Sequence, residues 1–365
     1  MPLRCGIVGL PNVGKSTLFN SLSSARAESA NYPFCTIDPN IGTIPVPDQR
    51  LFRIAELVKP EKVVPTTIEF VDIAGLVKGA SRGEGLGNQF LANIRQTDAI
   101  IHILRCFDDD NVVHVDATVD PVRDKEVVDT ELQLKDLETI RNRMQKVEKQ
   151  AKSGYKEAER LMQLLKKLDE YVSQGRPVRE LERSVEEKEM MKDLQLLTDK
   201  PVLYVCNVDE ASVVKGNGYV EDLKQAVKHE DAAVVVVAAS VEAEIAELET
   251  EEERQMFLED MGLEESGLGR LIRAAYRLLH LETFFTVGPK EVRAWTVKKG
   301  ATAARAGGMI HSDFERGFIK ADVIKYHDFI DQGSEAACKE SGKIFQEGKE
   351  YIVRDGDIIT FKFNV

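Results

Sequence analysis

Residues 9–16 read Gly9-Leu10-Pro11-Asn12-Val13-Gly14-Lys15-Ser16, which is the GxxxxGKS pattern of a phosphate-binding loop. In such a loop backbone N–H groups surround the β-phosphate, Lys15 reaches the β- and γ-phosphates, and the Ser16 hydroxyl binds Mg²⁺. An apolar strand candidate at residues 3–8 precedes the loop, and helical spacing of apolar residues over 16–22 follows it. The sequence therefore predicts a nucleoside triphosphate site, with a ligand-free glycine-rich turn as the alternative.

The composition is typical of a protein with several domains and a large core. The chain has 365 residues. It contains no apolar run long enough to span a membrane and no basic-then-apolar stretch at its beginning. Its five cysteines are scattered and never form a CxxC, so neither a disulfide framework nor a zinc site is indicated. We expect a cytoplasmic protein without membrane association.

The net charge of −13 is concentrated in one part of the chain. Residues 198–280 hold 8 basic and 18 acidic residues, whereas residues 281–365 hold 13 of each. The acidic run around Glu251-Glu252-Glu253 is typical of helices with a solvated face. No region is basic enough to predict strong nucleic-acid binding from charge alone.

The order of strand and helix signals predicts an interrupted α/β domain. Strand signals at residues 67–73 and 99–104 resume at 201–206 and 233–237. Residues 129–197 between them show only helical periodicity, with a turn near Gly154. We therefore expect a mostly parallel sheet formed by residues 1–128 and 198–280, and an inserted coiled-coil hairpin at 129–197. A third helix should follow a break at residues 175–177.

The C-terminal segment, residues 281–365, predicts a separate mixed sheet. Residues 292–297, 351–353 and 358–363 alternate like strands, and residues 354–357 form a turn. Trp295 and Phe318 are expected in its core rather than on a surface that stacks bases.

Two further motifs are expected to complete the phosphate site. Asp72-Ile73-Ala74-Gly75 ends a strand with a DxxG, in which the Asp72 carboxylate can bind Mg²⁺ through water and the Gly75 N–H can contact the γ-phosphate. Thr36, in the turn-rich stretch Asn31–Thr36, can close over Mg²⁺ when a γ-phosphate is present. The alternative role of Thr36 is a local hydrogen bond within the turn.

Catalysis needs a substitute for the glutamine that orients water in Ras-like GTPases. Leu76 occupies that position, and an alkyl side chain cannot orient water. Hydrolysis should therefore be slow without an activator. Candidate substitutes are His114, a partner protein, the Mg²⁺ and phosphates themselves, or K⁺ bound at Asn12. The other histidine of this region, His102, lies in an apolar strand and is expected in the core.

The base is predicted to be adenine at least as readily as guanine. GTPases read guanine with NKxD, whereas this chain has Asn207-Val208-Asp209-Glu210. An aspartate opposite adenine would face N1, which carries no proton, and a glutamate changes that geometry. Asn207 can still bond the adenine 6-amino group or N7. The expected ligand is ATP, with GTP secondary.

These motifs together resemble the Obg-related YchF, or Obg-like ATPase, family. The resemblance extends over essentially the whole chain, from residues 9–16 through 31–40 and 72–88 to 207–210. It implies a P-loop NTPase domain with a helical hairpin, a C-terminal TGS domain of the β-grasp type, ATP hydrolysis and association with the ribosome. Ala238-Ala239-Ser240 lies where the family commonly has Ser-Ala.

The motifs and the resemblance together give a set of candidate site residues. Lys15 and His114 are the catalytic candidates, and Ser16 and Thr36 bind Mg²⁺, with Asp72 acting through water. The nucleotide-binding residues are Asn12, Val13, Gly14, Lys15, Ser16, Thr17, Phe34, Cys35, Thr36, Asp72, Gly75, Asn207, Val208, Glu210, Ala239 and Ser240.

Two functions remain open at this stage. In the first, an ATPase uses turnover to switch its grip on the ribosome or its RNA, and the hairpin and C-terminal domain form a concave docking surface. In the second, a nucleotide-gated binding module or GTPase hydrolyses only incidentally. A monomer is the simplest expectation for both.

Overall fold

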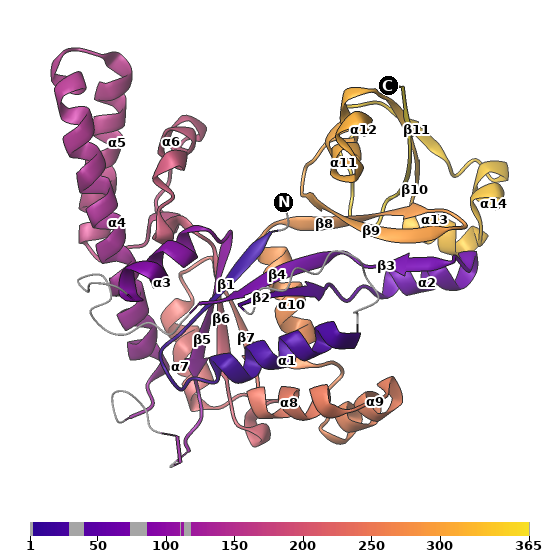
Figure 1. The fold of residues 1–365 in the computed structure, drawn as a ribbon, viewed down its shortest axis with the longest axis horizontal. Coiled ribbons are helices and arrows are strands. Elements are labelled where there is room, and N and C mark those ends of the chain that lie inside the picture. The colour runs from indigo at the N-terminus through magenta and orange to yellow at the C-terminus, as the bar shows by residue number, and fades with distance from the viewer. Residues whose placement is uncertain (1–2, 29–39, 74–85, 110, 113–117, 365) are drawn as a thin grey trace.

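A computed structural model describes residues 3–28, 40–73, 86–109, 111–112 and 118–364. It has two six-stranded sheets and a long helical hairpin. Figure 1 shows the hairpin and the C-terminal sheet projecting from the same side of the first sheet, on either side of strand β1. The described part of the chain contains no helix with both the length and the apolar character needed to cross a membrane.

The first sheet has the strand order β2-β4-β1-β5-β6-β7. Its strands are β1 (Arg4–Val8), β2 (Ile41–Pro45), β4 (Thr67–Asp72), β5 (Ala99–Arg105), β6 (Val202–Asn207) and β7 (Ala233–Val237). All neighbours are parallel except β2, which runs antiparallel to β4. Every residue of β5 and β6 is buried, as expected of central strands that are covered on both faces. The strands predicted for this domain are confirmed.

Helices cover both faces of this sheet. They are α1 (Lys15–Glu28), α3 (Leu86–Arg95), α7 (Gly218–Val227), α8 (Ala239–Glu247), α9 (Glu251–Asp260) and α10 (Gly267–Leu278). The three glutamates that begin α9 are exposed, as the acidic run predicted. Glu242 is different, because it is buried and its carboxylate accepts a hydrogen bond from Gly267 N at 2.7 Å. Burial raises its pKa.

The hairpin consists of α4 (Pro121–Lys152) and α5 (Lys156–Ser173), with Gly154 at φ +81° in the turn between them. The predicted boundary at residue 129 falls inside α4, which begins after the cap Asp120. The expected third helix is only the seven-residue α6 (Val185–Met191). It is accompanied by the 3-10 turns η1 (Val178–Glu180), η2 (Lys192–Leu194) and η3 (Leu197–Asp199). Side chains from both hairpin helices, α6, η1 and η2 share one apolar cluster.

Buried polar contacts attach the hairpin to the first sheet. Lys125 of α4 lies 2.8 Å from Glu230, which also accepts a hydrogen bond from the Tyr204 hydroxyl of β6 at 2.8 Å. Further along α4, the fully buried Asp136 accepts hydrogen bonds from the backbone N–H groups of Leu197 and Thr198. The base of the hairpin is therefore fixed to the sheet by directional bonds as well as by apolar packing.

The second sheet has the order β11-β10-β12-β8-β9-β3. Its strands are β3 (Lys62–Val64), β8 (Leu281–Val287), β9 (Glu291–Lys298), β10 (Phe318–Ile324), β11 (Phe345–Glu347) and β12 (Ile358–Phe363). The helices around it are α11 (Ala303–Ile310), α12 (Ser312–Arg316), α13 (Tyr326–Gln332) and α14 (Glu335–Glu340). Strands β8 and β12 are parallel neighbours inside the sheet, consistent with the expected β-grasp arrangement.

Local predictions for this segment had mixed outcomes. Trp295 and Phe318 pack against the apolar cluster of the domain, as predicted. The strand predicted at residues 351–353 is wrong, because Ile352 makes only an isolated bridge with Thr302. Tyr351 instead donates its hydroxyl to Asp357 at 2.7 Å, and Val353 is buried in the core, so alternation here reflects packing of a loop.

A segment from the first 128 residues belongs physically to the second sheet. Strand β3 pairs in parallel with β9, and Leu51 and Ile54 of α2 (Gln49–Val58) lie in that domain's core. Arg50 contacts Asp355 at 2.7 and 3.2 Å. Because α2 and β3 lie between β2 and β4 in the sequence, the second domain is directly connected to both of these strands.

Candidate nucleotide-binding site

The phosphate-binding loop connects β1 to α1 in a conformation that its glycines permit. Gly14 has φ +89°, and a Cβ at this position would lie 2.2 Å from the Asn207 side-chain nitrogen. Asn12 is also left-handed, at φ +62°, which asparagine tolerates better than most residues. Helix α1 then starts at Lys15, so its N-terminal N–H groups face the loop. Strand, loop and helix follow one another as the sequence predicted.

The structure brings the first two motifs into contact. The Lys15 ammonium lies 2.9 Å from the Asp72 carboxylate at the end of β4. Both side chains are largely shielded, with 11 % and 22 % of their surfaces exposed. Because β1 and β4 are parallel neighbours, their carboxyl ends meet at the same edge of the sheet.

Asn207 links the loop to the base-side motif. Its side-chain nitrogen donates to the Val13 carbonyl at 2.9 Å, and its side-chain oxygen accepts from Ala239 N at 2.9 Å. The residue is 5 % exposed. Asn207 is therefore a structural bridge between the phosphate loop and the start of α8, in which the nitrogen and the oxygen of its side-chain amide each make one hydrogen bond.

A cleft of about 830 Å³ lies over these residues. It is lined by Leu10, Pro11, Asn12, Gly14, Lys15, Ser16, Thr17, Phe107, Asp108, Asp109, Val112, Asn207, Val208, Asp209, Glu210, Ala239 and Ser240. Most of the described residues predicted to bind the nucleotide thus surround one cleft. Asp72 does not line it and reaches the site through Lys15, while Val13 is buried beneath the loop.

The two carboxylates of the base-side motif, Asp209 and Glu210, have different surroundings. Asp209 caps the 3-10 turn η4 (Glu210–Ser212) by accepting from Ser212 N at 2.9 Å. Glu210 lines the cleft and is exposed, whereas Val208 is buried. At the opposite wall Ala239 is buried and Ser240 is exposed. Asp209 and Glu210 thus both line the cleft, and Asp209 in addition caps η4.

One wall of the cleft was missed by the sequence reasoning. Arg105 is 2 % exposed, and its guanidinium donates to the carbonyls of Phe107, Asp109 and Val112 at 2.8–3.1 Å. The guanidinium also lies 4.7 Å from the centre of the Phe107 ring. A charged residue that ends the apolar run 99–104 was the available signal, because a buried arginine needs several acceptors.

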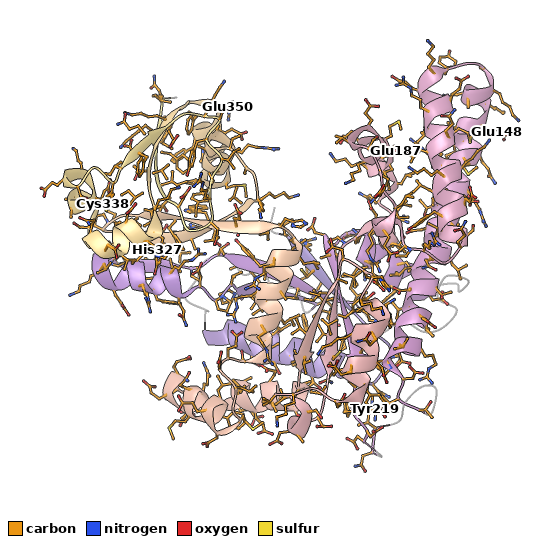
Figure 2. All side chains as sticks on the ribbon, turned by 180° about the vertical axis from the view of Figure 1, so that it is seen from behind. Glu148, Glu187, Tyr219, His327, Cys338 and Glu350 are labelled. Carbon is orange, nitrogen blue, oxygen red and sulfur yellow. The ribbon has the colours of Figure 1, made fainter. Side chains whose placement is uncertain are left out.

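Asp108, in the same wall, is held from outside the cleft. The Tyr219 hydroxyl lies 3.0 Å from both of its carboxylate oxygens, and this hydrogen bond raises the pKa of Tyr219. Figure 2 places Tyr219 at the opposite end of the molecule from Glu148 on the hairpin and Glu350 on the second domain. Both projections therefore extend away from the nucleotide cleft.

The donors at the phosphate end fit a magnesium ion. Ser16 offers an exposed hydroxyl at the start of α1, and Asp72 offers a carboxylate close by, both hard oxygen donors. Across the described ranges, no group of three or more His, Cys, Asp or Glu side chains could hold a metal ion alone. A metal here would need further oxygen ligands from phosphates and water, as in other phosphate loops.

Several predicted residues lie outside the described residues. These are Phe34, Cys35, Thr36, Gly75, Leu76 and His114. His102, predicted to be structural, is confirmed as buried, and burial lowers its pKa to about 4.

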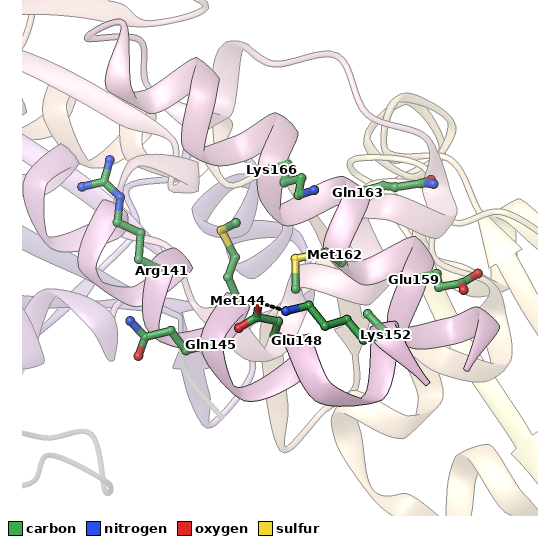
Figure 3. Close-up of a pocket in the computed structure, with 10 residues that line it drawn as sticks. Arg141, Met144, Gln145, Glu148, Lys152, Glu159, Met162, Gln163 and Lys166 are labelled. Carbon is green, nitrogen blue, oxygen red and sulfur yellow. Dashed lines mark hydrogen bonds and ion pairs between the residues drawn. The ribbon is translucent and has the colours of Figure 1, made fainter. Parts of the chain in front are cut away.

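A separate cavity of about 650 Å³ lies between α4 and α5. Figure 3 shows Met144 and Met162 pointing toward each other across it, with the Glu148–Lys152 ion pair at one side. Lys166 also lines this cavity. None of the phosphate-loop or base-side residues lines it, so the cavity is distinct from the nucleotide cleft.

Comparisons with known proteins agree with this geometry. A family model described as "50S ribosome-binding GTPase" matches residues 4–146. The model YchF-GTPase_C, described as a protein of unknown function (DUF933), matches residues 281–364.

Curated relatives match over the full length of both chains. The ribosome-binding ATPase YchF of Bacillus subtilis is 55 % identical over 367 residues, and that of Escherichia coli O157:H7 is 53 % identical over 365 residues. Among solved structures, the YchF GTPase of Schizosaccharomyces pombe is 36 % identical with a TM-score of 0.90, covering 99 % of this chain and 97 % of its own. The fold and the domain order are therefore shared with these proteins.

Proposed function

Since this chain belongs to the YchF family, we propose that it is a nucleoside triphosphatase that hydrolyses ATP and acts as a nucleotide-controlled switch on the ribosome. The observation that carries this proposal is the convergence of the phosphate loop, Asp72 and the Asn207–Glu210 motif around one cleft. The relatives that match the full length are named ribosome-binding ATPases.

At the phosphate end, Lys15 would exchange its contact with Asp72 for the β- and γ-phosphates. The Ser16 hydroxyl would hold Mg²⁺ directly, together with Thr36, and Asp72 would hold it through water. The bound ion would neutralise charge on the phosphate oxygens. The short Lys15–Asp72 distance supports this proposal, because a small movement of Lys15 frees the carboxylate for its second role.

At the base end, we assign adenine as the preferred partner. Asn207 is held by Val13 and Ala239, so it shapes the cleft, and Glu210 presents its carboxylate at the rim. A glutamate is one methylene longer than the aspartate that binds guanine, and it has no lysine beside it. Both differences weaken selection for guanine. GTP is the secondary ligand.

The attacking water would be activated by a group other than the glutamine of Ras-like GTPases. Leu76 cannot act as the orienting group, so His114 and K⁺ at Asn12 are the proposed aids, with Lys15 stabilising charge on the phosphates. The left-handed backbone of Asn12 supports the K⁺ site, because it places a loop asparagine at the cleft. Turnover would be slow until a partner binds.

We propose that the monomer docks on the ribosome through the surface between the hairpin and the second domain. A cleft of about 970 Å³ lies there, lined by Tyr171 and Arg183 on the hairpin side, by His280 at the junction and by Lys298 on β9. The resemblance to ribosome-associated proteins and this two-sided cleft support the assignment.

The test is ATP and GTP hydrolysis measured with and without ribosomes, in K⁺ and in Na⁺. ATP turnover should rise with ribosomes, be faster in K⁺, and disappear in Lys15→Ala. Unchanged turnover by Lys15→Ala would contradict the assignment of the site. A nucleotide-gated binding module is the remaining candidate, and ribosome binding that needs ATP while turnover stays at background would favour it.

A further inference from the structure

A small basic pocket lies where the end of α3 meets α4 and the turn η2. Its volume is about 320 Å³. Four cationic side chains line it, Arg95, Lys135, Arg143 and Lys146, together with only two carboxylates, Glu138 and Asp193. Figure 1 shows α3 beside the lower part of α4. The pocket therefore joins the hairpin to the helix that follows residues 74–85.

Both carboxylates of this pocket are already paired. Lys135 lies 2.7 Å from Glu138, and Arg143 lies 2.9 Å from Asp193. Arg95 donates to the neutral Thr139 hydroxyl at 3.2 Å. Within the described part of the chain, neither Arg95 nor Lys146 has a carboxylate within ion-pair distance. Neither cation thus has a direct ion pair, and Arg95 interacts only at longer range with the buried Asp136.

Unsatisfied donors add to this excess of positive charge. The Nε atoms of Arg95 and Arg143 are buried and have no hydrogen-bond partner among the described residues. A buried donor without an acceptor is unfavourable, and an anionic oxygen bound here would supply the missing acceptor. The pocket is therefore better suited to an anionic ligand than to a neutral one.

We propose that this pocket binds a phosphate of an RNA backbone, and this inference rests on the proposed association with the ribosome. Arginine forks fit phosphate oxygens, and exposed Lys146 adds a further charge at the rim. Asn142 and Gln195 also line the pocket, and their amides can bond the ribose hydroxyls next to a phosphate. A free phosphate would leave those amides without ribose partners.

The pocket also lies where two helices meet. Helix α3 ends at Arg95, and the segment before α3 begins directly after the DxxG strand β4. A phosphate held by Arg95 and Lys146 together would fix the end of α3 against α4.

The test compares two charge reversals on the hairpin, Lys146→Glu in the pocket and Lys166→Glu beside the Met144–Met162 cavity. Dissociation constants for purified ribosomes and for protein-free ribosomal RNA are measured over a salt series. Lys146→Glu should weaken both about five- to tenfold and lower the slope of log K against log salt by about one. Lys166→Glu carries the same charge change and should stay within about twofold of wild type.

Each outcome decides the inference. Equal effects of the two variants would overturn it, because the charge would then act non-specifically. Competition by inorganic phosphate or polyglutamate as strong as that by ribosomal RNA would also overturn the assignment to RNA. If wild type binds ribosomes and Lys146→Glu binds them equally, this site alone fails. If wild type binds neither ribosomes nor RNA, the proposed function fails with it. Matching thermal unfolding of both variants excludes misfolding.

Discussion

Replacing Asn207 by alanine should damage both folding and nucleotide binding, because this side chain joins three elements. The change removes two hydrogen bonds of 2.9 Å and leaves the Val13 carbonyl and the Ala239 N–H buried without them. An orphaned buried group costs about 1–3 kcal/mol, so the free energy of unfolding of the first domain should fall by about 2–6 kcal/mol. The phosphate loop loses its support from β6 at the same time.

Urea denaturation followed by circular dichroism measures the stability, and isothermal titration with Mg-ATP measures the affinity. We expect at least a tenfold weaker dissociation constant for Asn207→Ala, even under conditions where the variant remains folded. Asn20→Ala, an exposed position on α1, is the matched control and should change stability by less than about 0.5 kcal/mol. A loss below about 1 kcal/mol for Asn207→Ala, with unchanged affinity, would refute the bridging role.

Three further predictions concern the loop, the domain junction and a buried histidine. Gly14→Ala should abolish measurable ATP binding in titration, because of its φ of +89° and the 2.2 Å approach to the Asn207 nitrogen; wild-type affinity would contradict this. Arg50→Ala removes the ion pair with Asp355, which is partly exposed, so the free energy of unfolding should fall by about 1 kcal/mol and hydrogen exchange in β3 should become faster. Unchanged exchange would argue against a stabilising role of this ion pair. His102 has its pKa lowered to about 4 by burial, so the unfolded chain binds more protons between pH 4 and 6.5. Stability should therefore fall by about 3 kcal/mol as the pH drops through this window, and His102→Leu should show a shallower fall; parallel pH profiles would contradict it.

The sequence predicted those parts of the fold that have a clear hydrophobic period. The strand at 233–237 and the strand at 358–363 were predicted with the bounds that the structure has. The hairpin turn at Gly154 was also predicted, because apolar residues on both sides repeat at three and four. Each of these features depends on neighbours along the chain, which is the information that periodicity contains.

Features that depend on distant partners could not be predicted in this way. Strand β3 is only three residues long and owes its place to β9, more than two hundred positions later. The predicted strand at 351–353 alternates because Tyr351 and Val353 pack into one domain, although their backbone hydrogen bonds form an isolated bridge and a turn instead of a strand pair. Arg105 was overlooked because its partners are carbonyl groups, which leave no pattern in side-chain identity.

Where motifs are contiguous, the sequence predicted which residues would lie together. The phosphate loop and the Asn207–Glu210 stretch line one cleft as expected. Asn207 also bridges Val13 and Ala239, which the sequence did not predict, and its contact with the base stays a prediction. A free asparagine and a bridging asparagine look the same in a sequence, and only the fold distinguishes them.

The most direct test of the central claim is isothermal titration of the wild-type protein with Mg-ATP and Mg-GTP under identical conditions. The cleft bounded by Glu210 predicts that ATP binds at least as tightly as GTP, and that Glu210→Asp shifts the preference toward GTP. Binding of GTP alone, with no detectable heat from ATP, would contradict the account.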